Sequence, residues 1–269
     1  MSELDKIRQA SDVYGACRSY LFYGPPGSGK TTLAAMHPAK HKLWLDMDQK
    51  LGEMGVLPQR NLIKVWMPGE TLGNPERIEI PWSPDPKNVQ AGQIPTKKPQ
   101  GYERLVGVTN ELLADARKGT LEYDCVVLDT LTATADHWQR LLMYTHRVSF
   151  MTERLWGIYL AGLMEYINGF LTLPCDRIII CHEKRRTDED TKQDIVRPSL
   201  AGQLGDNLVR FFTEAYWLTG RERSGKYKLQ TVAANGATAR TSIGLEPEVI
   251  AGPEVFSAAG TVPAQTGTR

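Results

Sequence analysis

A glycine-rich segment near the N-terminus carries the clearest chemical signature in this sequence. Residues 24–31 read GPPGSGKT and match the pattern G-x-x-x-x-G-K-[ST] in full. Glycines let successive backbone N–H groups turn toward phosphate oxygens, and the helix that follows adds the positive end of its dipole. A glycine-rich surface turn is the alternative, but the strand-like run before the loop and the helical run after it favour a nucleoside-triphosphate site. We expect that site to be formed by Gly24, Pro25, Pro26, Gly27, Ser28, Gly29, Lys30, Thr31 and Thr32.

Two side chains of this loop could act directly on a bound triphosphate, and a carboxylate from another part of the chain would assist them. We expect the Lys30 ammonium to be exposed in the empty loop and to reach the β- and γ-phosphates, and the Thr31 hydroxyl to bind Mg²⁺. An acidic group must also hold the metal's water shell, at the end of a buried strand beside the loop. Residues 125–129, CVVLD, have that form and end in Asp129. Because many buried strands end in aspartate, a purely structural Asp129 is the alternative.

The elements that must position these residues follow from the spacing of apolar side chains. Buried strands are predicted at 19–23, 42–46, 123–129 and 177–181. Helices are predicted at 32–36, 102–118, 130–147 and 152–171. Toward the C-terminus we expect a polar loop at 183–199, a short helix at about 203–212, and strands near 215–218, 226–233 and 238–243. This alternation predicts an α/β fold with a mostly parallel central sheet flanked by helices.

Length and composition set the domain organisation. The chain has 269 residues, of which 41% are hydrophobic and 23% charged, and these values exclude a disordered, collagenous or coiled-coil protein. We assign residues 1–251 to one domain. Residues 68–100 contain seven prolines and little periodicity, so we expect an inserted loop there. The Ala/Gly/Pro/Thr-rich residues 252–269 are predicted to form a flexible tail.

Charge and cysteine content limit the partners and the compartment. Lys and Arg number 32 against 31 Asp and Glu, so any nucleic-acid surface must be a local patch. The four cysteines form no CxxC pair, which is typical of buried thiols in a reducing compartment. There is no signal-peptide pattern and no apolar run long enough to span a membrane. These observations predict a cytoplasmic protein that does not insert into membranes.

Three segments together resemble the core of RecA-type ATPases: GPPGSGKT, VVLDT, and Asp46-Met47-Asp48 at the end of a strand. The resemblance implies a P-loop NTPase with a RecA-like core, and a catalytic role for Asp48 in polarising the attacking water. The family usually has Glu at that place, so the side chain here is one methylene shorter. The alternative is that Asp46 and Asp48 are solvated carboxylates at a strand end. No base-reading signature such as NKxD appears, so only the resemblance favours ATP.

The same resemblance gives roles to residues further along the chain. His182 follows the apolar run 178–181, where RecA-like cores carry a polar sensor of the γ-phosphate; a His that only ends the strand is the alternative. In recombinases the loop at this place contacts single-stranded DNA, which implies DNA contacts for Lys184, Arg185 and Arg186. Because acidic residues follow them, a solvated charged face is equally consistent. Arg240 resembles an arginine finger supplied across a subunit interface, or it is a surface arginine without a role.

Over about residues 15–245 the sequence is similar to small phage-encoded RecA-core ATPases, described as AAA-domain or phage nucleotide-binding proteins and including the Sak-group annealing and recombination ATPases. That similarity implies a Mg²⁺-dependent ATPase, catalytic through Lys30, Asp48, Asp129, His182 and Arg240. It also implies an oligomer, ring or filament, that acts on single-stranded DNA in the cytoplasm of a phage-infected host. A single-strand DNA-binding protein would be a further partner. The alternative is a nucleotide-dependent switch that remodels a protein partner without touching DNA.

Overall fold

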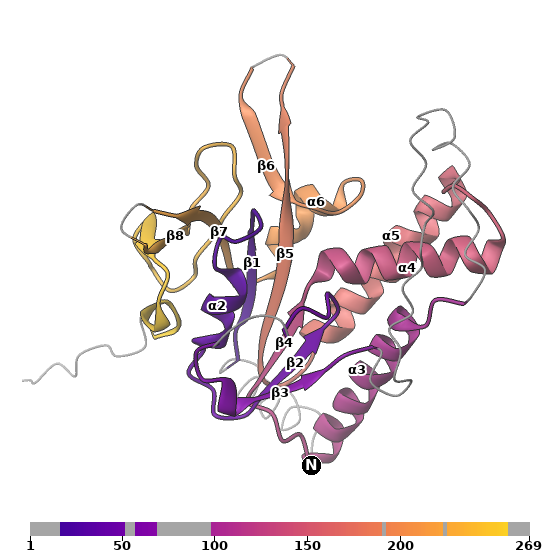
Figure 1. Cartoon of the computed structure of the whole chain (residues 1–269), viewed down its shortest axis with the longest axis horizontal. Coiled ribbons are helices and arrows are strands. Elements are labelled where there is room, and N and C mark those ends of the chain that lie inside the picture. The colour runs from indigo at the N-terminus through magenta and orange to yellow at the C-terminus, as the bar shows by residue number, and fades with distance from the viewer. Residues whose placement is uncertain (1–16, 52–56, 69–97, 190–191, 223–224, 258–269) are drawn as a thin grey trace, which may run out of the picture.

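A nine-stranded sheet forms the centre of the molecule (Figure 1). The computed structural model describes residues 17–51, 57–68, 98–189, 192–222 and 225–257. Within them the strands are β1 Ser19–Gly24, β2 Lys42–Asp46, β3 Ile63–Trp66, β4 Cys125–Asp129, β5 Asp176–Thr187, β6 Asp194–Pro198, β7 Glu214–Arg221, β8 Tyr227–Gln230 and β9 Glu248–Ile250. The order across the sheet is β3-β2-β4-β5-β1-β7-β8-β9, and β6 pairs with the far end of β5.

The central strands run parallel, as the sequence predicts. β3, β2, β4, β5, β1 and β7 form consecutive parallel pairs, whereas β8 and β9 add an antiparallel edge. In the register of these pairs, Gly24 lies opposite His182, and Asp129 lies between Asp46 and Ile180. The carboxyl ends of the four central strands therefore meet at one edge of the sheet, which is the edge where open α/β folds bind ligands.

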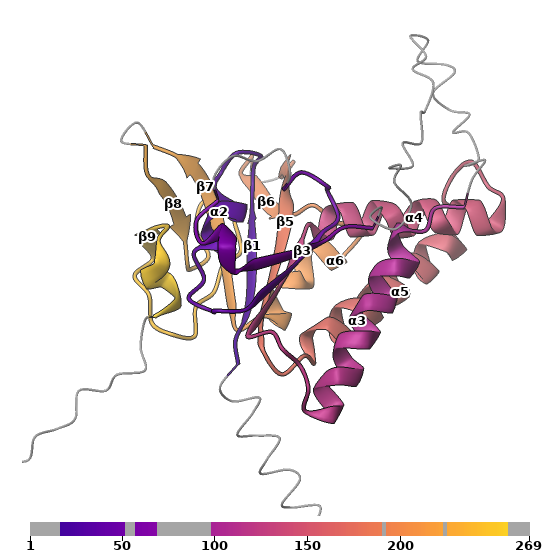
Figure 2. The ribbon, with the colours of Figure 1, turned by 60° about the horizontal axis from the view of Figure 1, so that its bottom comes forward.

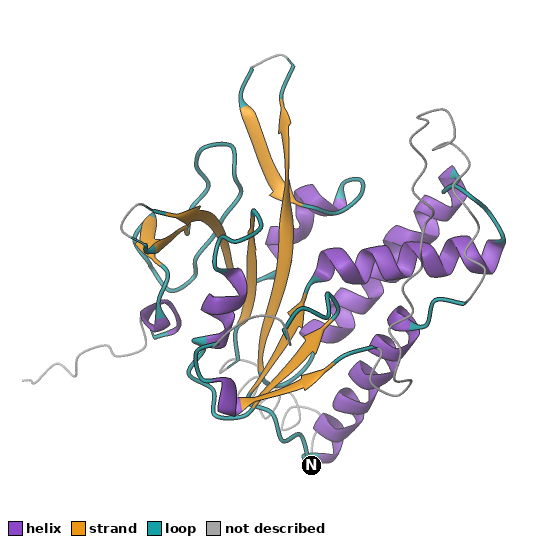
Figure 3. Cartoon of the chain, in the orientation of Figure 1, coloured by secondary structure: helices purple, strands orange, loops and turns teal. Residues whose placement is uncertain are grey.

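Helices cover both faces of the sheet (Figures 2 and 3). The α-helices are α2 Lys30–Ala35, α3 Gly101–Lys118, α4 Leu131–His146, α5 Glu153–Leu171 and α6 Leu204–Asn207, and the 3₁₀ turns are η1 Arg60–Leu62, η3 Leu208–Phe211 and η4 Pro253–Phe256. Thr130 and Thr152 cap α4 and α5 by accepting backbone N–H groups of the first turn. The helices predicted from apolar spacing are thus confirmed, with ends that differ by one or two residues.

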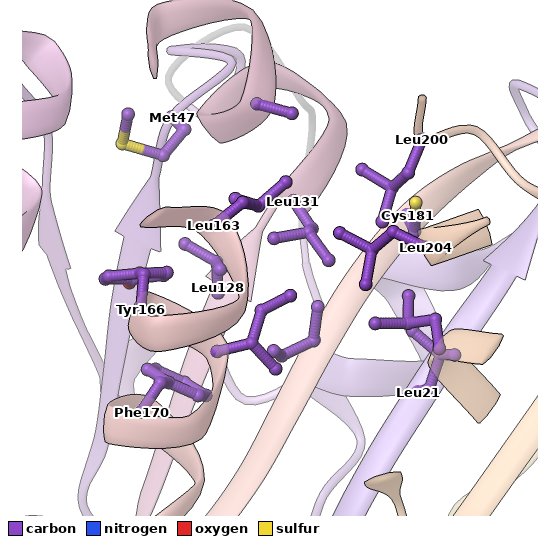
Figure 4. Close-up of a cluster of buried hydrophobic side chains, with 14 of the residues drawn as sticks. Leu21, Met47, Leu128, Leu131, Leu163, Tyr166, Phe170, Cys181, Leu200 and Leu204 are labelled. Carbon is purple, nitrogen blue, oxygen red and sulfur yellow. The ribbon is translucent and has the colours of Figure 1, made fainter. Parts of the chain in front are cut away.

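Alternate residues of each central strand enter two separate cores. Leu21 of β1 and Leu128 of β4 face the same core; in Figure 4 Leu128 lies near Leu163 of α5, and Leu21 lies near Leu204 of α6. Their neighbours Phe22 and Val127 face the second core, beneath α2. Burial on both faces explains why these strands are continuous apolar runs in the sequence.

The prediction of a polar loop at 183–199 is wrong, because most of the described residues of this segment form a β-hairpin. β5 continues for several residues beyond the sheet, and Glu183–Thr187 pair with Asp194–Pro198 of β6 in antiparallel register. The hairpin extends past the other strands at the top of Figure 1. A two-stranded ribbon satisfies its backbone groups by cross-strand hydrogen bonds while charged side chains stay in water, so a polar sequence does not exclude it.

The strand predicted at 238–243 is also wrong. Only Arg240 pairs there, through an isolated bridge to Ala215. Elsewhere in the segment, the Tyr23 hydroxyl donates to the Thr238 carbonyl, and the buried Glu214 carboxylate accepts a hydrogen bond from the backbone N–H of Ser242. The sequence pattern does not predict β3 and β9, which are strands of four and three residues.

The packed part of the chain extends beyond residue 251, whereas the sequence predicts a flexible tail from 252. In η4, Val255 is fully buried, and the Phe256 ring lies 5.4 Å from Tyr20 and 4.8 Å from His37. These two apolar side chains, with a hydrogen bond from the Arg18 guanidinium to the Phe256 carbonyl, hold the turn against the sheet. The proline-rich insertion lies mostly outside the described residues, which include only Pro68 and 98–100 of it. No helix in the described ranges is long and apolar enough to cross a membrane.

The packing of η4 can be tested by truncating its aromatic side chain. We expect Phe256→Ala to lower the free energy of unfolding by about 3 kcal/mol, because it leaves a cavity against Tyr20 and Phe22. Phe150→Ala is the matched control, since Phe150 is 65% exposed, and its effect should stay within about 0.5 kcal/mol. Urea denaturation of both variants gives the comparison. Equal stability of Phe256→Ala and the parent would contradict the packing described.

Candidate nucleotide-binding site

A hollow of about 340 Å³ lies at the carboxyl edge of the sheet. Its walls are residues 26–32 of the glycine-rich loop, the strand-end residues Asp46, Asp48, Asp129 and His182, and Tyr227 of β8. The structure therefore brings together most of the residues that the sequence singles out. Gly24 and Pro25, the first two residues of the loop, do not line the hollow, and their backbone carbonyls accept hydrogen bonds from Lys30.

The loop requires glycine at two positions for different reasons. Gly24 has a φ of 157°, and a Cβ atom there would lie 2.3 Å from the carbonyl oxygen of Leu218 in β7. Gly29, with a φ of 88°, is covered by the Tyr227 ring, which a Cβ atom would approach to 2.8 Å. Any side chain at either position would push the loop away from the strands that support it.

Lys30 is buried, and the expectation of an exposed ammonium is wrong. The residue is only 5% exposed, and its Nζ donates hydrogen bonds to the carbonyls of Gly24 at 2.9 Å and Pro25 at 2.7 Å. Burial lowers the pKa of Lys30, although the nearby Asp129 acts in the opposite direction. To reach a γ-phosphate, the ammonium must leave these carbonyls, so the Lys30 side chain must change its conformation when a triphosphate binds.

Asp129 and Thr31 lie side by side, as a shared metal role requires. The Asp129 Oδ2 accepts hydrogen bonds from the Thr31 hydroxyl at 3.1 Å and from the Trp44 indole N–H at 3.3 Å. Burial, reinforced by the charges of Asp46 and Asp48, raises the pKa of Asp129 to about 7. The carboxyl is therefore held partly protonated near neutral pH.

This donor set fits Mg²⁺. A hydroxyl and a carboxylate are hard oxygen ligands, and Mg²⁺ commonly takes only one or two groups from the protein and the rest from phosphates and water. The described residues contain no cluster of three or more His, Cys, Asp or Glu side chains that could hold a metal by themselves. The two-residue arrangement is thus the one expected for a metal that arrives with a nucleotide.

The two aspartates at the end of β2 have different surroundings. Asp46 turns back to accept the backbone N–H of Leu51 at 2.9 Å, and burial raises its pKa. Asp48 faces the hollow, where the Thr130 hydroxyl donates to its Oδ1 at 3.3 Å. Burial acts to raise the pKa of Asp48, but His182 and Lys50 outweigh it and hold that pKa below its ordinary value. Asp48 is therefore an ionised carboxylate that faces the hollow.

His182 stands in β5, between the strand of the phosphate loop and that of Asp129, where the sequence places it. Its backbone N–H donates to the Thr132 hydroxyl at 3.0 Å, and its Nε2 lies 3.7 Å from the Asp48 carboxylate. The Nδ1 atom is buried and has no hydrogen-bond partner within the described residues. The imidazole thus lies next to the carboxylate that faces the hollow.

The remaining candidate residues lie outside the hollow. Lys184, Arg185 and Arg186 are exposed on the hairpin. Arg240 is exposed, and its bridge to Ala215 puts it level with Leu21, three residues before the end of β1. Arg240 therefore does not reach the site of its own chain.

Tyr227 is a site residue that sequence reasoning missed. Its ring lies on Gly29, and the Arg221 guanidinium lies 5.9 Å from the ring centre. An aromatic face beside the loop can pack against a bound nucleotide. No local signal marks Tyr227, because it reaches the loop only through the pairing of β8 with β7.

A parallel α/β sheet whose carboxyl edge joins a G-x-x-x-x-G-K-[ST] loop, its threonine and a buried strand-end aspartate defines a P-loop NTPase with a RecA-like core. The family model described as "AAA domain" matches residues 17–242, and the chain belongs to this family. It is an ATP-hydrolysing enzyme, with ATP and Mg²⁺ as the cofactors usual for such ATPases.

Three solved structures show a distant likeness. A prototypical ATPase from the type III secretion system of pathogenic bacteria has a TM-score of 0.44 and 12% identity over 75% of this chain, which spans only 52% of that protein. The flagellar accessory protein FlaH from Methanocaldococcus jannaschii has a TM-score of 0.41 and 8% identity over 93% of this chain and 92% of its own. The RadB recombinase has a TM-score of 0.36 and 14% identity over 79% of each chain. No curated protein matches the sequence significantly.

The raised pKa of Asp129 predicts a pH-dependent cost to stability. Between about pH 4 and pH 7 the folded protein keeps a proton that the unfolded chain loses, so the free energy of unfolding falls as pH rises through this range. Asp129→Asn keeps both hydrogen bonds but removes the charge. We expect it to stabilise the nucleotide-free, metal-free protein by about 2–4 kcal/mol at about pH 8 and to have little effect at about pH 4.

Denaturant unfolding at the two pH values measures this difference. The control is Asp115→Asn on α3, which removes a half-exposed carboxylate remote from the hollow and should change stability little at either pH. A destabilised Asp129→Asn variant at the higher pH would show that the buried carboxylate is not strained by its neighbours.

Proposed function

We propose that this ATPase works on single-stranded DNA, in annealing or recombination of the phage type. The observation that carries the proposal is the continuity of β5. This one strand holds His182 beside the ATP hollow and Lys184, Arg185 and Arg186 on the projecting hairpin (Figure 1). A change at the hollow can therefore alter the hairpin without an intervening flexible joint.

The roles of the site residues follow from their surroundings. The backbone N–H groups of the loop and the Lys30 ammonium bind the phosphates, once Lys30 leaves the Gly24 and Pro25 carbonyls. Thr31 and Asp129 would hold Mg²⁺, which would supply positive charge to the phosphate oxygens. Asp48 is ionised and faces the hollow, so it accepts a proton from the attacking water. His182 contacts Asp48 and senses whether the γ-phosphate is present.

Assembly and context complete the proposal. Arg240 is exposed and remote from the hollow of its own chain. In an oligomer, ring or filament, its guanidinium would enter the nucleotide site of a neighbouring subunit as an arginine finger. A member of the Sak group would act in the cytoplasm of a phage-infected host, beside a single-strand DNA-binding protein. We assign residues 1–251 to the ATPase domain and add to it the turn η4, which packs against the sheet.

A steady-state ATPase assay with and without single-stranded DNA tests the proposal. We expect DNA to stimulate hydrolysis by the parent protein. Asp48→Asn should still bind a fluorescent ATP analogue but hydrolyse ATP about 100-fold more slowly, because the proton acceptor is lost. Asp115→Asn removes a carboxylate from the remote face of α3 and should hydrolyse ATP at the parent rate.

Two outcomes would contradict parts of the proposal. If Asp48→Asn hydrolyses ATP at the parent rate, a group other than Asp48 must polarise the attacking water. Glu183 is a poor substitute, because both its oxygens are already engaged by Arg185 and Trp217. ATP hydrolysis that does not respond to DNA, in a protein that does not bind DNA, would favour a switch that remodels a protein partner.

A further inference from the structure

We propose that only one face of the β5–β6 hairpin binds the phosphates of single-stranded nucleic acid: the face that carries Lys184, Arg186 and Arg197. Arg185, between the two β5 cations, instead braces the hairpin against the core. This inference rests on the proposed function and sharpens it, because it adds Arg197 to the binding surface and removes Arg185 from it.

Strand geometry separates the four cations into two faces. Side chains alternate along a strand, and directly paired residues of an antiparallel ribbon share a face. Lys184 pairs with Arg197, and Arg186 pairs with Ile195, so these side chains lie together. Arg185 pairs with Val196, which is buried in the core, so Arg185 is on the opposite face.

Arg185 is already neutralised where it stands. Its Nε donates to Glu183 at 2.5 Å, and its guanidinium lies 5.7 Å from the centre of the Trp217 ring. Trp217 also donates its indole N–H to the other Glu183 oxygen at 2.7 Å, so Arg185, Glu183 and Trp217 contact one another. A guanidinium paired with a nearly buried carboxylate and placed over an aromatic ring braces β5 against β7 and has little charge left for a phosphate.

The opposite face has a groove with free positive charge. A hollow of about 350 Å³ runs beside α6, lined by Lys184, Arg186, Arg197, Gln203 and Asp206 among others. Arg197 is held in place by Asp206 at 3.2 Å and by the Gly236 carbonyl at 2.8 Å. No residue in the described ranges is within ion-pairing distance of Lys184 or Arg186. Three cations against one carboxylate leave a net charge of about +2, which attracts a polyanion.

The chemistry of the groove indicates contact through phosphates. Lys184 and Arg186 are two residues apart on a strand, about 6.7 Å along its axis. The lining contains no aromatic side chain on which a base could stack. Binding should therefore depend strongly on salt and little on base sequence.

Neighbouring single substitutions on opposite faces test the inference. Arg186→Ala and Arg185→Ala remove the same charge from adjacent positions. The measurement is fluorescence anisotropy of a labelled oligothymidylate over a salt series, with a non-hydrolysable ATP analogue present. We expect Arg186→Ala to weaken binding and to reduce the slope of log affinity against log salt by about 0.7, the value for one phosphate of a single strand. Arg185→Ala should leave that slope unchanged.

A charge-matched pair keeps the test valid if Arg185→Ala loosens the hairpin. Lys184→Ala/Arg186→Ala should reduce the slope by about 1.4. Lys40→Ala/Lys64→Ala removes two exposed cations near the amino ends of β2 and β3 and should leave the slope unchanged.

The outcomes separate this inference from the proposed function. If the parent protein binds no oligothymidylate, the proposed DNA function itself is contradicted. If it binds, and Arg185→Ala lowers the slope as much as Arg186→Ala, the one-sided surface is wrong. If the hairpin variants lose self-association in sedimentation but keep the parent salt slope, the face is an interface between copies of this chain, which overturns the inference.

Discussion

The crowding of three carboxylates at one edge of the sheet is the constraint on which this site depends. Parallel pairing of β2, β4 and β5 places Asp46 directly opposite Asp129, and the next turn brings Asp48 to the same edge. Burial disfavours the ionised form of Asp129, the charges of Asp46 and Asp48 add to this effect, and together they raise the pKa of Asp129 to about 7. Keeping these carboxylates together lowers the stability of the folded protein, and this is typical of sites that bind a cation.

Each of the three carboxylates has its own hydrogen-bond or ion-pair partners, and among the described residues only Asp48 has cationic ones. Asp46 is satisfied by the backbone of its own turn, Asp48 by His182 and Lys50, and Asp129 by neutral donors. Lys30, the nearest cation of the loop, is directed to backbone carbonyls. When a magnesium nucleotide binds, Lys30 would exchange its backbone carbonyls for phosphate oxygens, and Asp129 would exchange a neutral donor for the metal. Lys30, Asp48 and His182 all line the hollow, and His182 belongs to the strand that continues into the hairpin.

Sequence alone predicts the parts of this site that depend on local pattern. The GPPGSGKT loop and the strand that ends in Asp129 were predicted from residue type and spacing, and the strand order confirms that His182 lies between them. The parts that depend on distant pairing were not predictable. The buried state of Lys30 depends on how the loop folds on itself, and Tyr227 reaches Gly29 only through the β7–β8 pair.

The same distinction explains the errors outside the site. A polar composition at 183–199 predicts a loop, but cross-strand hydrogen bonds make a hairpin and divide its cations between two faces. The residues after 251 have the composition of a tail, yet Val255 and Phe256 find an apolar surface made by β1 and α2. In both cases the deciding partner is remote in sequence.

A carbon-detected NMR titration of the aspartate carboxyl groups tests the central claim most directly. The protein would be labelled at aspartate, kept free of nucleotide and metal, and compared with Asp129→Asn to assign the resonance. The account predicts that Asp129 titrates with a midpoint of about 7, far above the exposed aspartates. A midpoint near the ordinary value of about 4 would contradict the combined burial and carboxylate crowding on which the site is built.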